Sequence, residues 1–88
     1  MKHEYKTAYK TRRMPSSING NPRYELSTMD GLVIGTTRPD SGIAYGPVPN
    51  YEGRICKIVV SVTPSGRRYV ESVEPIEKGV KPKRKAVK

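Results

Sequence analysis

The sequence predicts a small, mainly β domain: an antiparallel sheet of two hairpins, with α+β as the alternative class. The densest run of β-branched residues lies at Ile58–Val62, and such side chains favour the pleated surface of a strand. Asp30-Gly31 and Pro64-Ser65-Gly66 are turn sequences of the kind that close hairpins. The chain has 88 residues without Phe or Trp, so it can build one domain with a modest core.

The first hairpin is predicted from alternation and turn chemistry. Apolar and polar residues alternate over Arg23–Met29, Asp30-Gly31 is a favoured two-residue turn, and Leu32–Thr37 returns as the second strand. This turn would place Leu26 opposite Gly35. Both faces of the hairpin carry apolar residues, so the pattern alone leaves open which face is buried.

A short helix is predicted after this hairpin, capped by Asp40 or Ser41. The segment at residues 46–50 is predicted to be an extended linker, because its two prolines remove two backbone donors. Tyr45 and Tyr51 flank the linker. Each ring either packs on the neighbouring prolines or is exposed as a loop that contacts a partner.

The second hairpin is predicted over Arg54–Ile76, around a Pro-Ser-Gly turn in which Gly66 takes the left-handed conformation. Two registers are open. The turn itself places Val60 opposite Val70, whereas a one-residue shift through a bulge at Gly66 would place Tyr69 there and gather the apolar residues better. The four strands would follow the order ββ(α)ββ, and the sheet could curl into an SH3-like or OB-like barrel.

Charge divides the chain into three parts. The net charge is +9, yet residues 14–77 hold six basic and seven acidic side chains. Residues 1–13 carry five basic side chains against one acid, and residues 78–88 carry six with no acid. The predicted parts are therefore a basic flexible arm (1–14), a single small domain (15–77) and a basic disordered tail (78–88).

The residue types that perform catalysis or bind metals are scarce. The only histidine, His3, lies in the predicted arm, and the only cysteine, Cys56, lies in an apolar strand where a buried thiol is usual. Neither a Walker motif nor a dinucleotide fingerprint occurs. A single cysteine fits a reducing compartment, and no apolar run reaches the roughly 18 residues that span a bilayer. We therefore expect a cytoplasmic protein that is not an enzyme and has no metal, cofactor or membrane span.

The basic ends indicate a protein that binds DNA or RNA through phosphate contacts. Tyr5 and Tyr9 of the arm would be available to stack on bases. Arg38 and Arg54 are further candidates on the folded body. The predicted contacts are the basic residues of the arm, the hairpin tip and the tail: Lys6, Lys10, Arg12, Arg13, Arg67, Arg68, Lys81, Lys83, Arg84 and Lys85.

Other interpretations of the same features stay open. Lys-rich ends can serve solubility alone, or they can dock on an anionic membrane surface. In a different class, the protein would be a modulator that binds a host protein through a strand edge or through the Tyr45–Tyr51 loop. The small core also favours stabilisation by a partner or by a second copy in a homodimer.

Turn sequences within residues 15–76 resemble those of small proteins encoded by actinobacterial phages and mobile elements. The shared features are Asn-Gly-Asn-Pro-Arg-Tyr at 19–24, Asp-Gly at 30–31, Pro-Asp-Ser at 39–41 and a closing hairpin through Gly66-Arg67. Those proteins usually have a more regular, alanine-containing helix after the second strand, and Gly42 and the proline-rich loop depart from that pattern. The resemblance implies a phage or mobile-element origin and a bacterial host cytoplasm, and it implies no activity.

Overall fold

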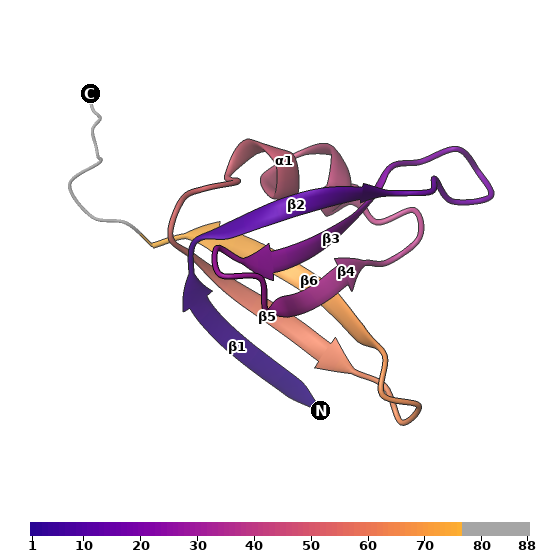
Figure 1. Ribbon diagram of the computed structural model, residues 1–88. Coiled ribbons are helices and arrows are strands. Elements are labelled where there is room, and N and C mark those ends of the chain that lie inside the picture. The colour runs from indigo at the N-terminus through magenta and orange to yellow at the C-terminus, as the bar shows by residue number, and fades with distance from the viewer. Residues whose placement is uncertain (77–88) are drawn as a thin grey trace.

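Six strands form one sheet in the computed structural model, which describes residues 1–76 (Figure 1). The elements in chain order are β1 (Lys2–Thr7), β2 (Tyr9–Met14), β3 (Arg23–Thr28), β4 (Val33–Thr37), η1 (Gly42–Tyr45), α1 (Pro47–Asn50), β5 (Cys56–Val62) and β6 (Arg68–Pro75). The order across the sheet is β1-β5-β6-β4-β3-β2, and every pair is antiparallel except β4 and β6, which are parallel. The mainly β class is therefore confirmed, with two more strands than the predicted ββ(α)ββ order.

The first 14 residues form strands, so the prediction of a flexible arm is wrong. Strand β1 pairs with β5 and β2 pairs with β3, each along its full length. The many charged residues of this segment conceal an inward face: Tyr9 is fully buried and Tyr5 packs against the core. These rings are therefore part of the core rather than free to stack on bases, and the folded unit begins at β1 instead of residue 15.

Strands β1 and β2 are the two edges of the sheet, although only Ala8 separates them in the chain. A chain that passes from one edge to the other within a single residue requires the sheet to roll until its edges approach at that corner, as Figure 1 shows. Within residues 1–76 no ladder joins β1 to β2. The sheet is therefore rolled but is not closed into an SH3-like or OB-like barrel.

The β3–β4 hairpin forms around Asp30-Gly31 and contains a bulge. Leu26 lies opposite Gly35, as the sequence predicts. The register then shifts by one, so that Ile34 is an extra residue in β4. Leu26 and Ile34 are both fully buried, which identifies the face of the hairpin that the sequence pattern left open.

The β5–β6 hairpin takes the first of the two predicted registers at its turn, with Val60 opposite Val70 and Gly66 at φ +90°. A bulge does occur, but it lies within the strands and not at Gly66, because Glu71 is the extra residue of β6. Residues three apart normally point to opposite faces of a strand. The bulge allows Val70 and Val73 to face the same core, and both are buried.

The segment between the hairpins forms two short helical turns. Ser41, one of the two predicted caps, occupies the N-cap position of η1, but its side chain forms no capping hydrogen bond. The prediction of an extended linker at residues 46–50 is wrong, because residues 47–50 form α1. Pro47 and Pro49 both lie in the first turn of this helix, where backbone N–H groups have no intrahelical acceptor, so neither proline removes a hydrogen bond.

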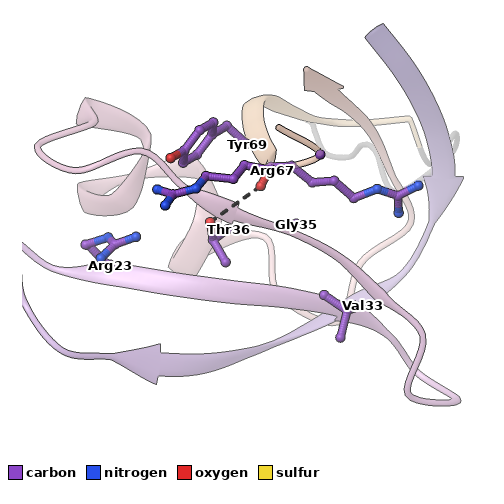
Figure 2. Close-up of a pocket in the computed structure, with 8 residues that line it drawn as sticks. Arg23, Val33, Gly35, Thr36, Arg67 and Tyr69 are labelled. Carbon is purple, nitrogen blue, oxygen red and sulfur yellow. Dashed lines mark hydrogen bonds between the residues drawn. The ribbon is translucent and has the colours of Figure 1, made fainter. Parts of the chain in front are cut away.

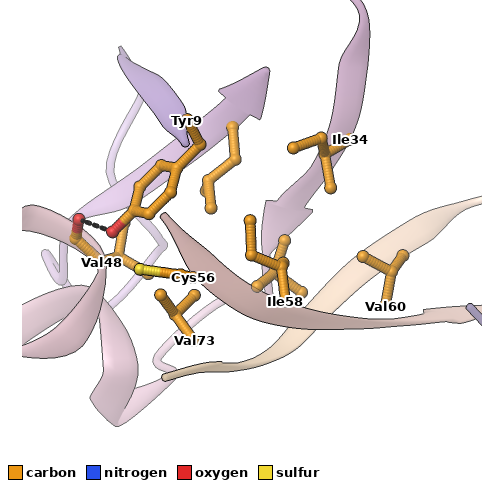
Figure 3. Packing of buried hydrophobic residues seen from close by; sticks show 9 residues of the cluster. Tyr9, Ile34, Val48, Cys56, Ile58, Val60 and Val73 are labelled. Carbon is orange, nitrogen blue, oxygen red and sulfur yellow. Dashed lines mark hydrogen bonds between the residues drawn. The ribbon is translucent and has the colours of Figure 1, made fainter. Parts of the chain in front are cut away.

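The buried core lies inside the rolled sheet and under α1 (Figure 3). Tyr9 is its largest side chain, and its hydroxyl donates a hydrogen bond to the backbone oxygen of Val48 at 2.6 Å. Burial raises the pKa of the Tyr9 hydroxyl, which therefore remains a protonated donor. The buried set comprises Tyr9, Leu26, Ile34, Val48, Cys56, Ile58, Val60, Val70 and Val73. Cys56 is thus buried as the sequence predicts.

A short parallel pair joins the two hairpins. Thr36 lies opposite Tyr69 and Thr37 opposite Val70. At Gly35 a Cβ atom would lie 3.2 Å from the backbone oxygen of Arg68, closer than an ordinary van der Waals contact. Glycine at this position therefore permits the close approach of β4 to β6.

We expect Gly35→Ala to lower the free energy of unfolding by about 1–3 kcal/mol, the usual cost of overpacking, because its methyl group pushes against the β6 backbone. Urea unfolding followed by circular dichroism measures the change. Gly42→Ala is the matched control, since no atom lies within 4 Å of the Cβ position there, and it should change stability by less than about 0.5 kcal/mol. Equal losses in the two variants would show that the close approach is unimportant.

Candidate nucleic-acid interface

A pocket of about 340 Å³ lies where β3, β4 and the tip of the β5–β6 hairpin meet (Figure 2). Thr36 and Tyr69 alternate along their strands with Thr37 and Val70, which are buried. The first two side chains therefore point to the outer face of the sheet, and the pocket is on that face. Its lining residues are Arg23, Val33, Gly35, Thr36, Gly66, Arg67, Arg68 and Tyr69.

Local sequence explains how the β6 side of the pocket is built. Gly66 adopts a positive φ and ends the turn, so that Arg67 precedes β6, and Arg68 and Tyr69 begin it. The Thr36 hydroxyl lies 3.5 Å from the Arg68 backbone oxygen. The Arg68 guanidinium donates a hydrogen bond to the Tyr5 hydroxyl on β1 at 3.1 Å. Arg68 therefore links the pocket to the edge strand.

Positive charge is concentrated around Tyr69. A hydrogen bond from Arg67 lowers the pKa of the Tyr69 hydroxyl, and the charges of Arg67, Arg38 and Arg23 lower it further. The Arg38 guanidinium also lies over the ring, 4.6 Å from its centroid. Figure 2 shows Arg23 and Tyr69 at one end of the pocket and Val33 at the other.

Carboxylates neutralise only part of this charge. Glu71 accepts hydrogen bonds from Arg38, with an Nη2–Oε2 distance of 2.7 Å, and from the Ser61 hydroxyl. These bonds lower the pKa of Glu71, which therefore remains ionised. Within the described chain, by contrast, neither Arg23 nor Arg67 forms an ion pair with a carboxylate.

Arg23 has an unusual polar atom. Its Nε is excluded from solvent and has no hydrogen-bond partner among residues 1–76. Buried donors are normally paired, because an unpaired one has lost its hydrogen bonds to water without replacement. Besides Arg68, whose guanidinium bonds the Tyr5 hydroxyl, the pocket thus has two arginines that pair with no carboxylate of the described chain, Arg23 and Arg67, and Arg23 has an unused donor.

Of the predicted phosphate contacts within residues 1–76, the structure brings two together, Arg67 and Arg68, which both line the pocket. Arg12 instead pairs with Glu25 on the neighbouring strand at 3.1 Å. The other predicted contacts of the first 14 residues, on β1 and β2, do not line the pocket: Lys6, Lys10 and Arg13. The predicted contacts in the tail lie outside the described residues: Lys81, Lys83, Arg84 and Lys85.

The predicted aromatic loop is divided between the surface and the core. Tyr45 is 63% exposed, and its hydroxyl bonds the side chain of Asn21. Tyr51 packs against the core, with the Arg54 guanidinium 5.8 Å from its ring centroid. Only Tyr45 therefore presents most of its ring to solvent.

Six of the eight lining residues were absent from the sequence-based site prediction, and three of the six have polar or charged side chains: Arg23, Thr36 and Tyr69. Tyr69 directly follows two arginines after a turn, and basic residues beside an aromatic ring are a recognisable nucleic-acid signal. No comparable signal marks Arg23 or Thr36. They reach the pocket only because β4 lies between β3 and β6, and the parallel pairing of β4 with β6 joins segments far apart in the sequence.

Among residues 1–76 no group of three or more His, Cys, Asp or Glu side chains could hold a metal ion. In the same residues no helix has the length and apolar character needed to cross a membrane. No protein-family model, curated protein or solved structure matches the chain. The chemistry of the pocket is therefore the best indication of function.

We expect Arg67→Ala to raise the pKa of Tyr69 toward its ordinary value of about 10, because the variant removes the donor and the charge that favour the phenolate. Ring ¹³C NMR over an alkaline titration measures this pKa, with the resonance assigned from Tyr69→Phe. Arg12→Ala is the control, since Arg12 is paired with Glu25 and is not among the groups that lower the Tyr69 pKa. A Tyr69 pKa that does not change in Arg67→Ala would contradict this electrostatic description.

Proposed function

We propose that this protein binds nucleic acid, DNA or RNA, without acting as an enzyme. The observation that supports this best is the presence of Arg23 and Arg67 beside Tyr69 in a pocket that no carboxylate lines. Guanidinium groups match the geometry of phosphate oxygens and form charge-assisted hydrogen bonds with them. A net charge of +9 adds long-range attraction for a polyanion.

A role in solubility alone explains this arrangement poorly. Soluble proteins need charge, but they do not need two arginines without carboxylate partners around one pocket, where like charges repel. An incoming phosphate removes that repulsion. The six basic residues of 78–88 would add further phosphate contacts that position the protein without reading base sequence. The resemblance to phage proteins supports an accessory role for a phage or mobile element in a bacterial cytoplasm.

A second candidate is a modulator that binds a host protein by strand addition. The two edges of the sheet differ in this respect. On β2, the Thr11 N–H donates to Glu52 at 2.7 Å and the Tyr9 oxygen accepts from Gly53, so the loop between α1 and β5 covers part of that edge. Strand β1 is paired on one side only, by β5. A host partner retained after nuclease treatment, and also by a variant without the pocket arginines, would support this candidate.

We expect Arg23→Gln/Arg67→Gln to weaken nucleic-acid binding about tenfold or more, because each arginine donates a charge-assisted bond to phosphate. Fluorescence anisotropy with a labelled oligonucleotide at about 50 and 200 mM salt measures this. The slope of log affinity against log salt should also become shallower, by roughly 0.7–0.9 for each lost contact.

Lys2→Gln/Lys57→Gln is the control, because it removes the same charge from residues that do not line the pocket. It should weaken binding much less than the pocket variant. Circular dichroism confirms that both proteins are folded. The proposed function is wrong if the natural protein binds no nucleic acid, and the pocket is not its site if both double variants lose affinity equally.

A gain of affinity provides an independent test. Glu71→Gln removes the carboxylate that pairs with Arg38 beside Tyr69, while the amide keeps a similar shape. We expect binding to become severalfold tighter at low salt, and this difference should shrink as salt screens the added charge. The same anisotropy assay measures it, and weaker binding by this variant would count against the proposed site.

A further inference from the structure

An apolar side chain lies at the end of the pocket opposite Arg23 and Tyr69. Val33 lines the pocket there and is 44% exposed (Figure 2). Leu32 is its neighbour in the chain and Met29 is on the other side of the same hairpin turn, and they are 59% and 58% exposed. The tip of the β3–β4 hairpin thus presents large apolar side chains next to an arginine-lined pocket.

We propose that the pocket and this hairpin tip together bind single-stranded nucleic acid in preference to a duplex. A backbone phosphate lies between Arg23 and Arg67, and the adjoining unpaired base packs on Leu32 and Val33. This inference rests on the proposed function and specifies its ligand.

The two halves of the site require different parts of one ligand. A duplex offers phosphates, but its base faces are hidden in the stack and only the base edges reach the grooves. A single strand offers phosphates together with free base faces, which bind apolar and aromatic side chains. Only the single strand therefore supplies a partner for the arginines and for Leu32 and Val33 at the same time.

The arginine end is prepared for a phosphate group. Arg23 and Arg67 both line it, and within the described chain neither forms an ion pair with a carboxylate, so a phosphate group would meet two cationic donors there. A phosphate oxygen beside Arg23 would accept from its Nε, the donor that lacks a partner within residues 1–76. The volume of about 340 Å³ is at the small end of the range for ligand pockets and suits one phosphate with its neighbouring base.

A phosphorylated peptide with an apolar residue beside the phosphate has related chemistry. The charge of this chain favours the nucleic acid, because a net charge of +9 is matched better by a continuous polyanion than by a single phosphate group. The peptide is therefore an outcome of the test and not the proposal.

The test compares a labelled oligothymidine of about twelve nucleotides with its duplex form, using anisotropy and the full-length chain. We expect the single strand to bind at least tenfold more tightly. Leu32→Ser/Val33→Ser should weaken binding of the single strand about fivefold or more, since stacking of one base is lost, and should leave duplex binding unchanged. Both side chains are substantially exposed, so the variant should fold, and circular dichroism checks this.

Ile18→Ser/Ile55→Ser is the matched control, because both isoleucines are exposed and neither lines the pocket. It should bind like the natural protein. Equal affinity for both forms, or an unchanged Leu32→Ser/Val33→Ser variant, would overturn this inference while leaving nucleic-acid binding intact. Absence of binding to either form would overturn the proposed function itself. A phosphoserine peptide that displaces the strand at comparable concentration would assign the pocket to peptides instead.

Discussion

The burial of Tyr9 is the interaction on which the rest of this structure depends. The chain has neither Phe nor Trp, and Tyr9 is the largest side chain in the core. A buried hydroxyl needs an acceptor, and the Val48 backbone oxygen of α1 provides it at 2.6 Å. The burial of the Tyr9 ring and the position of α1 therefore depend on each other. Because Tyr9 directly follows Ala8, its burial also fixes the corner at which the two edges of the sheet approach.

The outer site is a consequence of how the core is filled. Burial of Val70 and Thr37 turns their neighbours Tyr69 and Thr36 outward, where they line the pocket. The close approach at Gly35 brings β4 against β6, and with it the arginines of two hairpins around one cavity. Core packing thus determines the position of every group that we assign to the ligand, although none of these groups belongs to the core.

This arrangement changes how the basic residues of the chain are understood. The cations of the first 14 residues are side chains of two edge strands, and lysines on an edge also discourage pairing with another chain. The folded unit has a basic site of its own, with fixed geometry. In the proposed function, this site defines one phosphate position and the basic residues of 78–88 supply attraction that is independent of geometry.

The sequence by itself determined the local features: both hairpins, their turns, the buried Cys56 and the distribution of charge. These follow from interactions between near neighbours, such as the backbone freedom of Gly66 and the strand preference of β-branched residues. Only the tertiary structure decided that the charged first segment forms two strands. The inward face of this segment consists of a few residues, such as Tyr5 and Tyr9, which pack against the core only when the sheet rolls over them. The tertiary structure likewise decided the bulges and the parallel β4–β6 pair, which bring Arg23 near Arg67. Pairing between distant segments is selected by burial in the assembled core, so the local sequence does not reveal it.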